Sequence, residues 1–580
     1  MEHHEHHHDH EASASTAAFS TDTAGLPQAV PTQVVELADG DTFELRIAPV
    51  ATRIGDDTVR MIAYNGSIPG PTLRVREGSA LVADVVNEGD LEATVHWHGL
   101  RLENRYDGTH ETQAPIPVGG DFTYRIEFPD PGVYWYHPHI REDYGQELGL
   151  YGNILVEPAE TGYWPPAHRE VALTLDDILI EDGQVAAFSH HGPSHVAMGR
   201  FGETMLIGGE TDVSLEAKRG EVVRVFLTDT ANTRVFRVGF VGATMKLVGG
   251  DSGRVEREEI VEDVILAPSE RIVVDVLFDT AGEAVLEHRT PAQTYRLATV
   301  QVSEEEAEPL DFEALRVNAD LVTERDRIAP YLEAEPDKTL SFVAEMNMPS
   351  AEGETGVFAC PMHPEIVASW EGKCPKCGMK LIPAGPDVPA PTEYACPMHP
   401  EITATWAGEC PKCGMTLRAT GSGELEDHEH HHHDHGRSHD ATEGIEWEDD
   451  MVEVNRETTT ANTQWFFVDK DTGDRGHAID WRFRVGDQVK IRIVNEMDSD
   501  HPMHHPFHMH GAGRFVVLSR DAVPEANLVW KDTVLVRTGE TVDILLDVTN
   551  PGRWMAHCHI AEHHESGMML SFDVLPANAA

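Results

Sequence analysis

Met555-Ala-His-Cys-His-Ile-Ala-Glu-His-His-Glu-Ser-Gly-Met568 is a stretch dense in metal-binding side chains, and it begins as a predicted strand after the turn Asn550-Pro-Gly-Arg553. Neighbouring side chains on a strand point to opposite faces, so His557 and His559 face one way and Cys558 the other. His563 and Met568 follow the cysteine by five and ten residues, near enough for the chain to return to the sulfur. A thiolate, two imidazoles and a thioether are the ligands of a blue-copper site. The stretch therefore predicts one strand shared by two metal sites.

Outside the low-complexity histidine tracts, three other segments repeat the His-x-His spacing and supply the missing imidazoles. They are His96-Trp-His98, His137-Pro-His139 and His508-Met-His510. His505 has the opposite strand parity to His508 and His510, so it can join Cys558 while they join a separate cluster. A single buried histidine is usually an ordinary core residue, but four such pairs, one of them interleaved with a cysteine, favour a metal cluster.

These motifs resemble those of the three-domain multicopper oxidases, the laccase and cuprous oxidase family, over residues 33–348 and 444–576. The resemblance implies four copper ions, one of type 1, one of type 2 and two of type 3. The type 1 ligands would be His505, Cys558, His563 and Met568, with Met569 a weaker axial candidate. The type 2 ligands would be His96 and His508. The type 3 ligands would be His98, His137, His139, His510, His557 and His559.

The hydrophobic pattern predicts an all-β fold. Short alternating runs punctuated by Gly and Pro are typical of antiparallel sandwiches, and the resemblance implies three cupredoxin-like Greek-key β-sandwich domains. The expected division is a His-rich head and flexible linker (1–32), domain 1 (33–158), domain 2 without copper ligands (159–303), an acidic, helix-prone linker (304–337), and domain 3 (338–348 and 444–576).

An insert, residues 349–443, interrupts domain 3 and contains an internal repeat over 358–383 and 394–417. Each copy has the spacing Cys-x2-His-x10-Cys-x2-Cys, which can close a tetrahedron of three thiolates and one imidazole. The predicted ligands are Cys360, His363, Cys374 and Cys377, and then Cys396, His399, Cys410 and Cys413. The copies resemble the small heavy-metal-binding domain of copper-exporting proteins. They suit Cu(I) or, as structural ribbons, Zn, and the His-rich tract 428–435 suits loosely bound divalent ions.

Composition excludes several classes of protein. Lys and Arg number 44 against 100 Asp and Glu, a formal net charge of −56, which argues against nucleic acid as a partner. We expect no disulfides, since copper and the insert claim all seven cysteines. The sequence has no run of 18 apolar residues, so it predicts no membrane-spanning helix. The N-terminus has no apolar h-region, so the sequence is either that of a processed mature chain or that of a protein that stays inside the cell. Because the resembled family is mostly exported, we expect a mature chain, periplasmic or extracellular. We also expect a monomer.

By the resemblance, a reducing substrate gives electrons to the type 1 copper, and dioxygen is reduced to water at the three-copper cluster. The insert favours Cu(I) as the substrate, with Fe(II) as a further candidate, in copper tolerance. A laccase acting on phenols and aromatic amines is the alternative. A copper nitrite reductase and a copper store without turnover are disfavoured, because neither needs all eight cluster histidines.

Proton supply to the cluster requires nearby acidic groups. Asp107, nine residues after His98, is the expected donor, with a solvated loop aspartate as the alternative. Similar oxidases commonly place a glutamate directly after the second type 1 histidine, where this chain has His564. Either His564 relays protons itself, or Glu562 or Glu565 does so.

Overall fold

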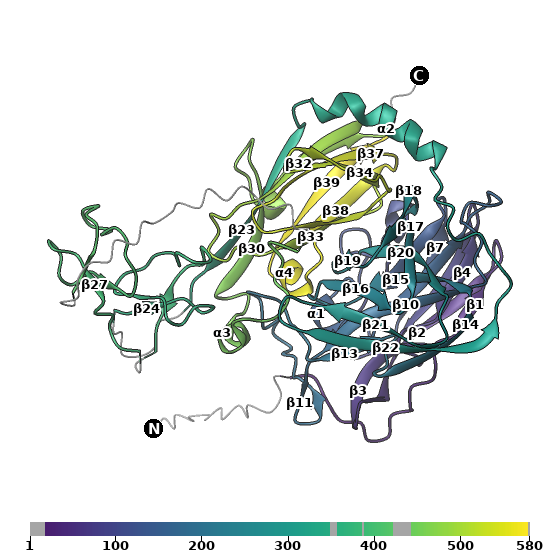
Figure 1. The fold of residues 1–580 in the computed structure, drawn as a ribbon, viewed down its shortest axis with the longest axis horizontal. Helices are drawn as coiled ribbons and strands as arrows, with labels where there is room; N and C mark the ends of the chain where they lie inside the picture. Colours follow the sequence, from purple (N-terminus) through teal and green to yellow (C-terminus); the bar gives the residue numbers. More distant parts are fainter. Residues whose placement is uncertain (1–17, 349–355, 386–387, 421–441, 578–580) are drawn as a thin grey trace, which may run out of the picture.

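The computed structural model describes residues 18–348, 356–385, 388–420 and 442–577 (Figure 1). The His-rich tract 428–435 and the first 17 residues of the predicted head lie outside this part of the chain. The described chain is built from three β-sandwiches and a separate lobe, as the all-β prediction requires. Among its helices, none combines the length and the apolar character that crossing a bilayer demands.

The first sandwich joins the sheet β1-β4-β9-β8-β6 to the sheet β3-β2-β5-β7. Its strands are β1 (Val34–Glu36), β2 (Thr42–Ile54), β3 (Asp57–Tyr64), β4 (Thr72–Arg76), β5 (Ala80–Asn87), β6 (His96–His98), β7 (Asp121–Glu127), β8 (Gly132–His137) and β9 (Gly152–Glu157). Strand β5 alternates between partly and fully buried side chains, as one face of a sheet on a core should. Strands β6 and β8 pair so that His96 lies opposite His137.

The second sandwich joins the sheet β13-β10-β15-β20-β17-β18 to the sheet β14-β22-β21-β16-β19. Its strands are β10 (Arg169–Ile178), β13 (Thr204–Ile207), β14 (Val213–Arg219), β15 (Glu221–Asp229), β16 (Phe236–Val241), β17 (Thr244–Gly250), β18 (Gly253–Val261), β19 (Val264–Leu266), β20 (Arg271–Phe278), β21 (Gly282–Arg289) and β22 (Thr294–Glu306), with the small hairpin β11 (Ile180–Glu181) and β12 (Gln184–Val185). Val133 and Leu155 of the first sandwich share a core with Phe226 and Val273 of the second.

The third sandwich joins the sheet β30-β23-β32-β37-β34-β35 to the sheet β31-β39-β38-β33-β36. Its strands are β23 (Lys338–Met346), β30 (Thr463–Asp469), β31 (Trp481–Arg484), β32 (Gln488–Asn495), β33 (His505–Met509), β34 (Gly513–Arg520), β35 (Val523–Pro524), β36 (Thr533–Val536), β37 (Thr541–Val548), β38 (Gly552–Cys558) and β39 (Met569–Leu575). The helix-prone linker contains α2 (Ala319–Leu332), whose Leu321 and Ile328 pack on this sandwich. Of three short helices, α1 (Glu142–Gly145) follows β8 of the first sandwich, whereas α3 (Val452–Glu457) and α4 (Ala561–Glu565) belong to the third.

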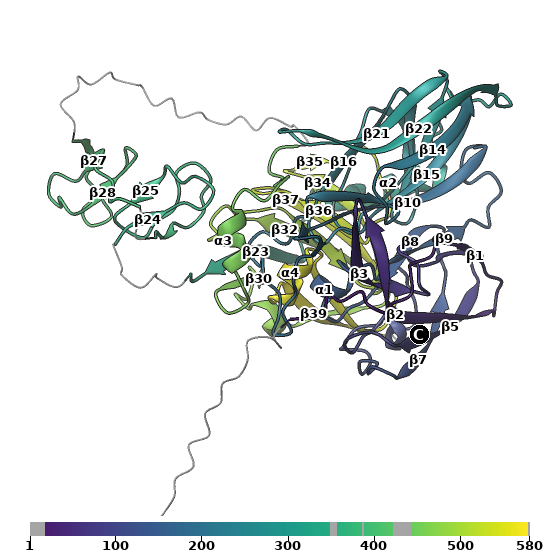
Figure 2. The ribbon, with the colours of Figure 1, turned by 90° about the horizontal axis from the view of Figure 1, so that it is seen from below.

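The insert leaves the third sandwich after β23 and returns before α3, so β23 and β30 pair although the whole insert separates them. It forms one small sheet, β26-β24-β25-β28-β27-β29. These strands are β24 (Phe358–Ala359), β25 (Val367–Ala368), β26 (Ile382–Pro383), β27 (Tyr394–Ala395), β28 (Thr403–Ala404) and β29 (Arg418–Ala419). Figures 1 and 2 show this lobe projecting from the body beside β23 and α3.

Candidate metal centres

Cys558 lies at the end of β38, and the fold brings the predicted side chains to it. Its Sγ is 3.5 Å from His505 Nδ1 and 3.8 Å from His563 Nδ1, and the two Nδ1 atoms are 3.3 Å apart. His505 arrives on β33, which pairs with β38 so that Phe507 lies opposite Cys558. The Cys558 amide donates to Met568 O at 3.1 Å, which holds the buried Met568 beside the cysteine. The four residues predicted from the sequence therefore form one buried group.

The surroundings of this group are apolar and closed. The Trp465 ring lies 4.6 Å from the His505 ring and 4.2 Å from the His563 ring, and Phe342 lies 5.1 Å from His505. Burial raises the pKa of the Cys558 thiol. A buried thiolate is stable only beside positive charge, and a metal cation supplies that charge. The donor set thus fits a copper ion.

The eight histidines of the four His-x-His pairs gather between the first and third sandwiches, all with 0–2% of their surface exposed. One group is His98, His137 and His559, and a second is His96, His98 and His508, each with its nearest nitrogens within 4.8 Å of one another. In a third, His510 Nε2 lies 3.0 Å from His557 Nε2 and 3.3 Å from His139 Nε2. Each group draws on both sandwiches, so the seam between them is a candidate multinuclear metal centre.

Backbone carbonyls orient several of these rings. The Nδ1 atoms of His96, His137 and His508 donate to the carbonyl oxygens of Asp107, Pro138 and Asp532 at 2.7, 2.8 and 2.9 Å. Within the described part of the chain, the Nε2 atoms of these three rings have no hydrogen-bond partner. Burial lowers the pKa of every ring, that of His96 to about 4, so the imidazoles are neutral and offer free lone pairs. Buried, unpartnered nitrogens aimed at one space fit bound copper ions.

Asp107 contacts the centre through both its backbone and its side chain. Its Oδ2 lies 2.9 Å from His510 Nδ1, and its carbonyl oxygen accepts from His96. Burial raises the pKa of this carboxyl. The structure therefore puts Asp107 against the histidine cluster and not in a solvated loop.

Sequence reasoning missed Glu142, which lies at the other side of the cluster on α1. Its Oε1 is 3.2 Å from His139 Nδ1 and its Oε2 is 3.3 Å from His564 Nδ1. The His564 ring lies 4.4 Å from that of His557, and burial lowers its pKa to about 3. The available signal was an acidic residue only three positions after His139, near enough in the chain for the two side chains to meet.

The two predicted glutamates of α4 differ in position. Glu562 is buried and faces Thr233 Oγ1 at 3.4 Å, and burial together with Asp143 raises its pKa to about 7. Glu565 accepts from the Glu142 amide at 3.3 Å, and burial raises its pKa to about 8. Glu565 therefore extends the His564–Glu142 contact, whereas Glu562 turns towards the second sandwich.

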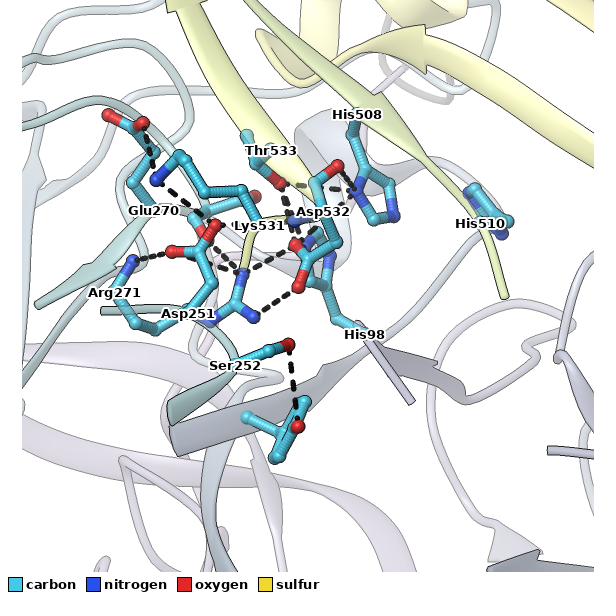
Figure 3. A network of polar contacts seen from close by, with 12 residues as sticks. His98, Asp251, Ser252, Glu270, Arg271, His508, His510, Lys531, Asp532 and Thr533 are labelled. Atoms are coloured by element: carbon cyan, nitrogen blue, oxygen red, sulfur yellow. Dashed lines mark hydrogen bonds and ion pairs between the residues drawn. The ribbon is translucent and has the colours of Figure 1, made fainter. Parts of the chain in front are cut away.

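A buried ion pair that the sequence did not predict joins all three sandwiches at the cluster (Figure 3). Asp532 Oδ1 lies 3.0 Å from His98 Nε2 and accepts from Arg271 Nη1 at 2.7 Å. Arg271 comes from β20 of the second sandwich and also donates to Val133 O of the first at 3.0 Å. Because Nε2 of His98 contacts Asp532, its Nδ1 is the ring nitrogen that has no hydrogen-bond partner among the described residues. Arg271 thus fixes the carboxylate that orients a candidate ligand.

The two repeats of the insert present matching thiol and imidazole groups. In the first, Cys360 Sγ lies 3.7 Å from both His363 Nδ1 and Cys377 Sγ, and Cys374 Sγ lies 3.7 Å from His363 Nδ1. In the second, the corresponding distances are 3.8, 3.7 and 3.6 Å. Ligands about 2.3 Å from one ion at tetrahedral angles lie about 3.8 Å apart, so both sites fit a tetrahedral ion such as Zn²⁺.

Comparison with known proteins agrees with this arrangement. Residues 47–161 and 448–578 match family models described as multicopper oxidase, and residues 357–384 and 393–420 each match the heavy metal binding domain. A relative, multicopper oxidase MmcO of Mycobacterium tuberculosis, is 26% identical over 92% of this chain and 88% of its own.

Solved structures of similar fold include a multicopper oxidase from Pseudomonas thermotolerans, with 23% identity, a TM-score of 0.59, and coverage of 93% of this chain and 100% of the other. Another is a multicopper oxidase from Campylobacter jejuni described as a metallo-oxidase, with 19% identity and a TM-score of 0.59 over 96% of this chain and 99% of the other.

Replacing Asp532 with Asn should destabilise the whole molecule. It removes the charge that faces the fully buried Arg271 and leaves Asp251, 3.9 Å away, as the remaining counter-charge. Losing one partner of a buried pair costs about 3 kcal/mol of unfolding free energy. Denaturant unfolding of the metal-free protein measures this, with Asp480→Asn, from an exposed pair with Arg482, as the control. Equal destabilisation by both changes would contradict the anchoring role of Asp532.

Proposed function

The chain belongs to the multicopper oxidase family, with two heavy-metal-binding domains inserted in its third sandwich, and from this we propose that it oxidises Cu(I) with dioxygen. In this proposal His505, Cys558, His563 and Met568 hold type 1 copper. His96 and His508 hold type 2 copper, and the other six cluster histidines hold the type 3 pair. Bound there, copper supplies one-electron oxidation of substrate and reduction of dioxygen to water.

The observation that carries Cu(I) as substrate is a contact between soft donors beside the proposed type 1 site. Met198 Sδ lies 3.0 Å from Nε2 of His501, which is fully buried. The neighbouring Ala197 O is 3.3 Å from His563 Nε2. Thioether and imidazole groups suit Cu(I). Met198 directly follows Ala197, the residue whose carbonyl oxygen contacts the proposed copper ligand His563.

Methionines continue from this pair towards the insert. Met198 shares one cluster of buried side chains with Met346, Met379 and Met451, and with Cys360 and Cys374 of the first repeat. The net charge of −56 also favours cations over neutral aromatic substrates near the surface. The chain is also similar in fold to a structure described as a metallo-oxidase, which agrees with a metal ion as the substrate.

A laccase for phenols and aromatic amines is the second candidate, because Trp465 and Phe342 give the proposed type 1 site an apolar wall. Fe(II) would be a further metal substrate. We also propose a role in copper tolerance and a location in the periplasm or outside the cell, and that the repeats hold Cu(I) or Zn. The contact of Met198 with His501 favours Cu(I) over phenols as the substrate.

For the protons that dioxygen reduction consumes, we propose Asp107 on one side of the cluster and Glu142 with His564 on the other. Asp107 and Glu142 are carboxyls whose pKa burial raises, which favours the protonated form that a proton donor needs. Glu565, which contacts the Glu142 backbone, would connect that side to the partly exposed end of α4. Glu562 faces Thr233 and not the histidine cluster, so it is a less suitable member of this proton route.

Replacing Cys558 with Ser should abolish the blue colour and the oxidase turnover of copper-loaded protein. The thiolate is the proposed chromophore and the proposed link between the type 1 copper and the histidine cluster, and serine provides neither. Visible absorption and copper analysis test this, with the eight cluster histidines expected to keep binding copper. Blue colour retained in the variant would refute the type 1 assignment.

Asp107→Asn should slow the oxygen half of the reaction by roughly 100-fold or more, the usual contribution of a positioned acid. Substrate should still bleach the blue colour at the normal rate under anaerobic conditions, because Asp107 touches the histidine cluster and not the Cys558 group. Stopped-flow measurement of reduction and reoxidation separates the two halves. Normal steady-state turnover at neutral pH would clear Asp107 of this role.

Met198→Leu should raise the KM for Cu(I) by roughly tenfold, the scale on which weakening a metal site acts. Leucine keeps the side-chain volume and removes the sulfur, so phenol oxidation should change little. Changing the six insert cysteines to Ser should also raise the KM for Cu(I) at low buffered Cu(I), since tethered ions are locally concentrated. Steady-state kinetics with both substrates decides. Unchanged Cu(I) kinetics in both variants would favour the laccase reading.

A further inference from the structure

The two repeats of the insert are nearly identical in sequence but occupy different places. In Figures 1 and 2, strand β24 of the first repeat lies nearer the body of the molecule, and β27 of the second lies farther out. The second repeat is held by the first through β25 and β28, where Ala368 lies opposite Ala404. Ser369 Oγ also donates to Glu401 O at 2.8 Å. The first repeat therefore separates the second from the oxidase body.

Two lysines dock the first repeat on the loop that leads to the proposed type 1 site. Lys373 Nζ lies 2.6 Å from Asp498 Oδ1 and donates to Ser499 O at 3.1 Å. The Lys380 amide donates to Asp500 O at 2.8 Å, and its Nζ lies 3.2 Å from Asp500 Oδ2. These lysines directly flank the turn Cys374–Met379, which carries two of the metal-binding cysteines.

The docking contacts coincide with sequence differences between the repeats. An offset of 36 residues aligns Lys373 with Glu409 and Lys380 with Thr416. By contrast, the ion pair of Lys376 with Glu365 has its counterpart in Lys412 with Glu401, inside the second repeat. The ion pair internal to a repeat thus occurs in both repeats. The two lysines that contact the oxidase body occur only in the first.

The docked loop is itself bound to the sheet and ends at candidate copper ligands. Ser499 Oγ accepts from the Ala344 amide at 2.7 Å, and Asp500 Oδ2 accepts from the Met346 amide at 3.0 Å. His501, which contacts Met198, follows Asp500, and His505 is four residues further along the chain. A change in the position of Lys373 or Lys380 therefore acts on the backbone that carries His501 and His505.

We propose that metal binding to the first repeat, and not to the second, controls the order of the loop Asp498–His501 and thereby the type 1 site. A metal ion that joins Cys374 and Cys377 to Cys360 and His363 fixes the turn between the two lysines, because small thiolate sites are ordered by their metal. Fixed lysines hold Asp498 and Asp500 in place. This coupling rests on the type 1 assignment proposed above, and it deepens the proposed function by naming its regulator.

The test compares matched cysteine pairs in the full-length, copper-loaded protein. Cys374→Ser with Cys377→Ser removes the metal of the first repeat, and Cys410→Ser with Cys413→Ser removes that of the second. Two surface ion pairs correspond to about a tenfold change in a local opening equilibrium. Hydrogen exchange at the amides of Ala344, Lys380 and Asp500 should accelerate about tenfold in the first variant and stay unchanged in the second. The blue absorption band should shift only in the first.

A second variant separates docking from metal binding. Lys373→Glu with Lys380→Thr gives the first repeat the residues of the second and keeps all its metal ligands. Metal content should stay at the wild-type value while exchange in the loop accelerates as in the first cysteine pair. Lys376→Ala, which breaks only the pair with Glu365, is the control and should leave exchange unchanged.

Equal effects of the two cysteine pairs, or wild-type exchange in the double lysine variant, would overturn the proposal. Exchange and metal content are measured without any reducing substrate. A finding that phenols are the true substrate would therefore refute the Cu(I) proposal and leave this coupling intact. Conversely, unchanged exchange in the variants would refute the coupling and leave the Cu(I) proposal intact.

Discussion

Eight neutral imidazoles face one another in the buried seam between the first and third sandwiches, and the rest of the structure depends on that constraint. A buried nitrogen without a partner costs about 1–3 kcal/mol, and the seam has several of them. The unpartnered imidazole nitrogens therefore disfavour the contact between the first and third sandwiches, and bound cations would remove that cost. The second sandwich compensates in part, because its Arg271 holds Asp532 and through it His98.

Strand β38 and helix α4 show how few residues connect the two centres. Cys558 belongs to the Cys–His–Met group, while His557 and His559 on either side of it belong to the histidine cluster. The turn into α4 then brings His563 back to the sulfur and His564 towards the cluster. Because alternate side chains of a strand leave on opposite faces, the shortest route between the centres is the backbone of three consecutive residues.

The sequence predicted those parts of the molecule that depend on local spacing. The period of a strand was enough to separate Cys558 from His557 and His559, and the Cys-x2-Cys spacing was enough for the insert sites. Asp107 was expected from its distance to His98, and it contacts His510. Arg271, Asp532 and Met198 could not be found in this way, because each acts on a residue hundreds of positions away or in another sandwich. Glu142 had a local signal, three residues after His139, that was not used.

The position of the insert follows from the same sheet geometry. Strand β23 is bordered by β30 on one side and by β32 on the other, and β32 runs into the loop that leads to His505. A segment inserted after Met346 therefore emerges next to residues 498–505, although more than 140 residues of sequence lie between them. Proximity to the proposed type 1 site is thus a property of the insertion point, and Lys373 and Lys380 convert that proximity into fixed contacts.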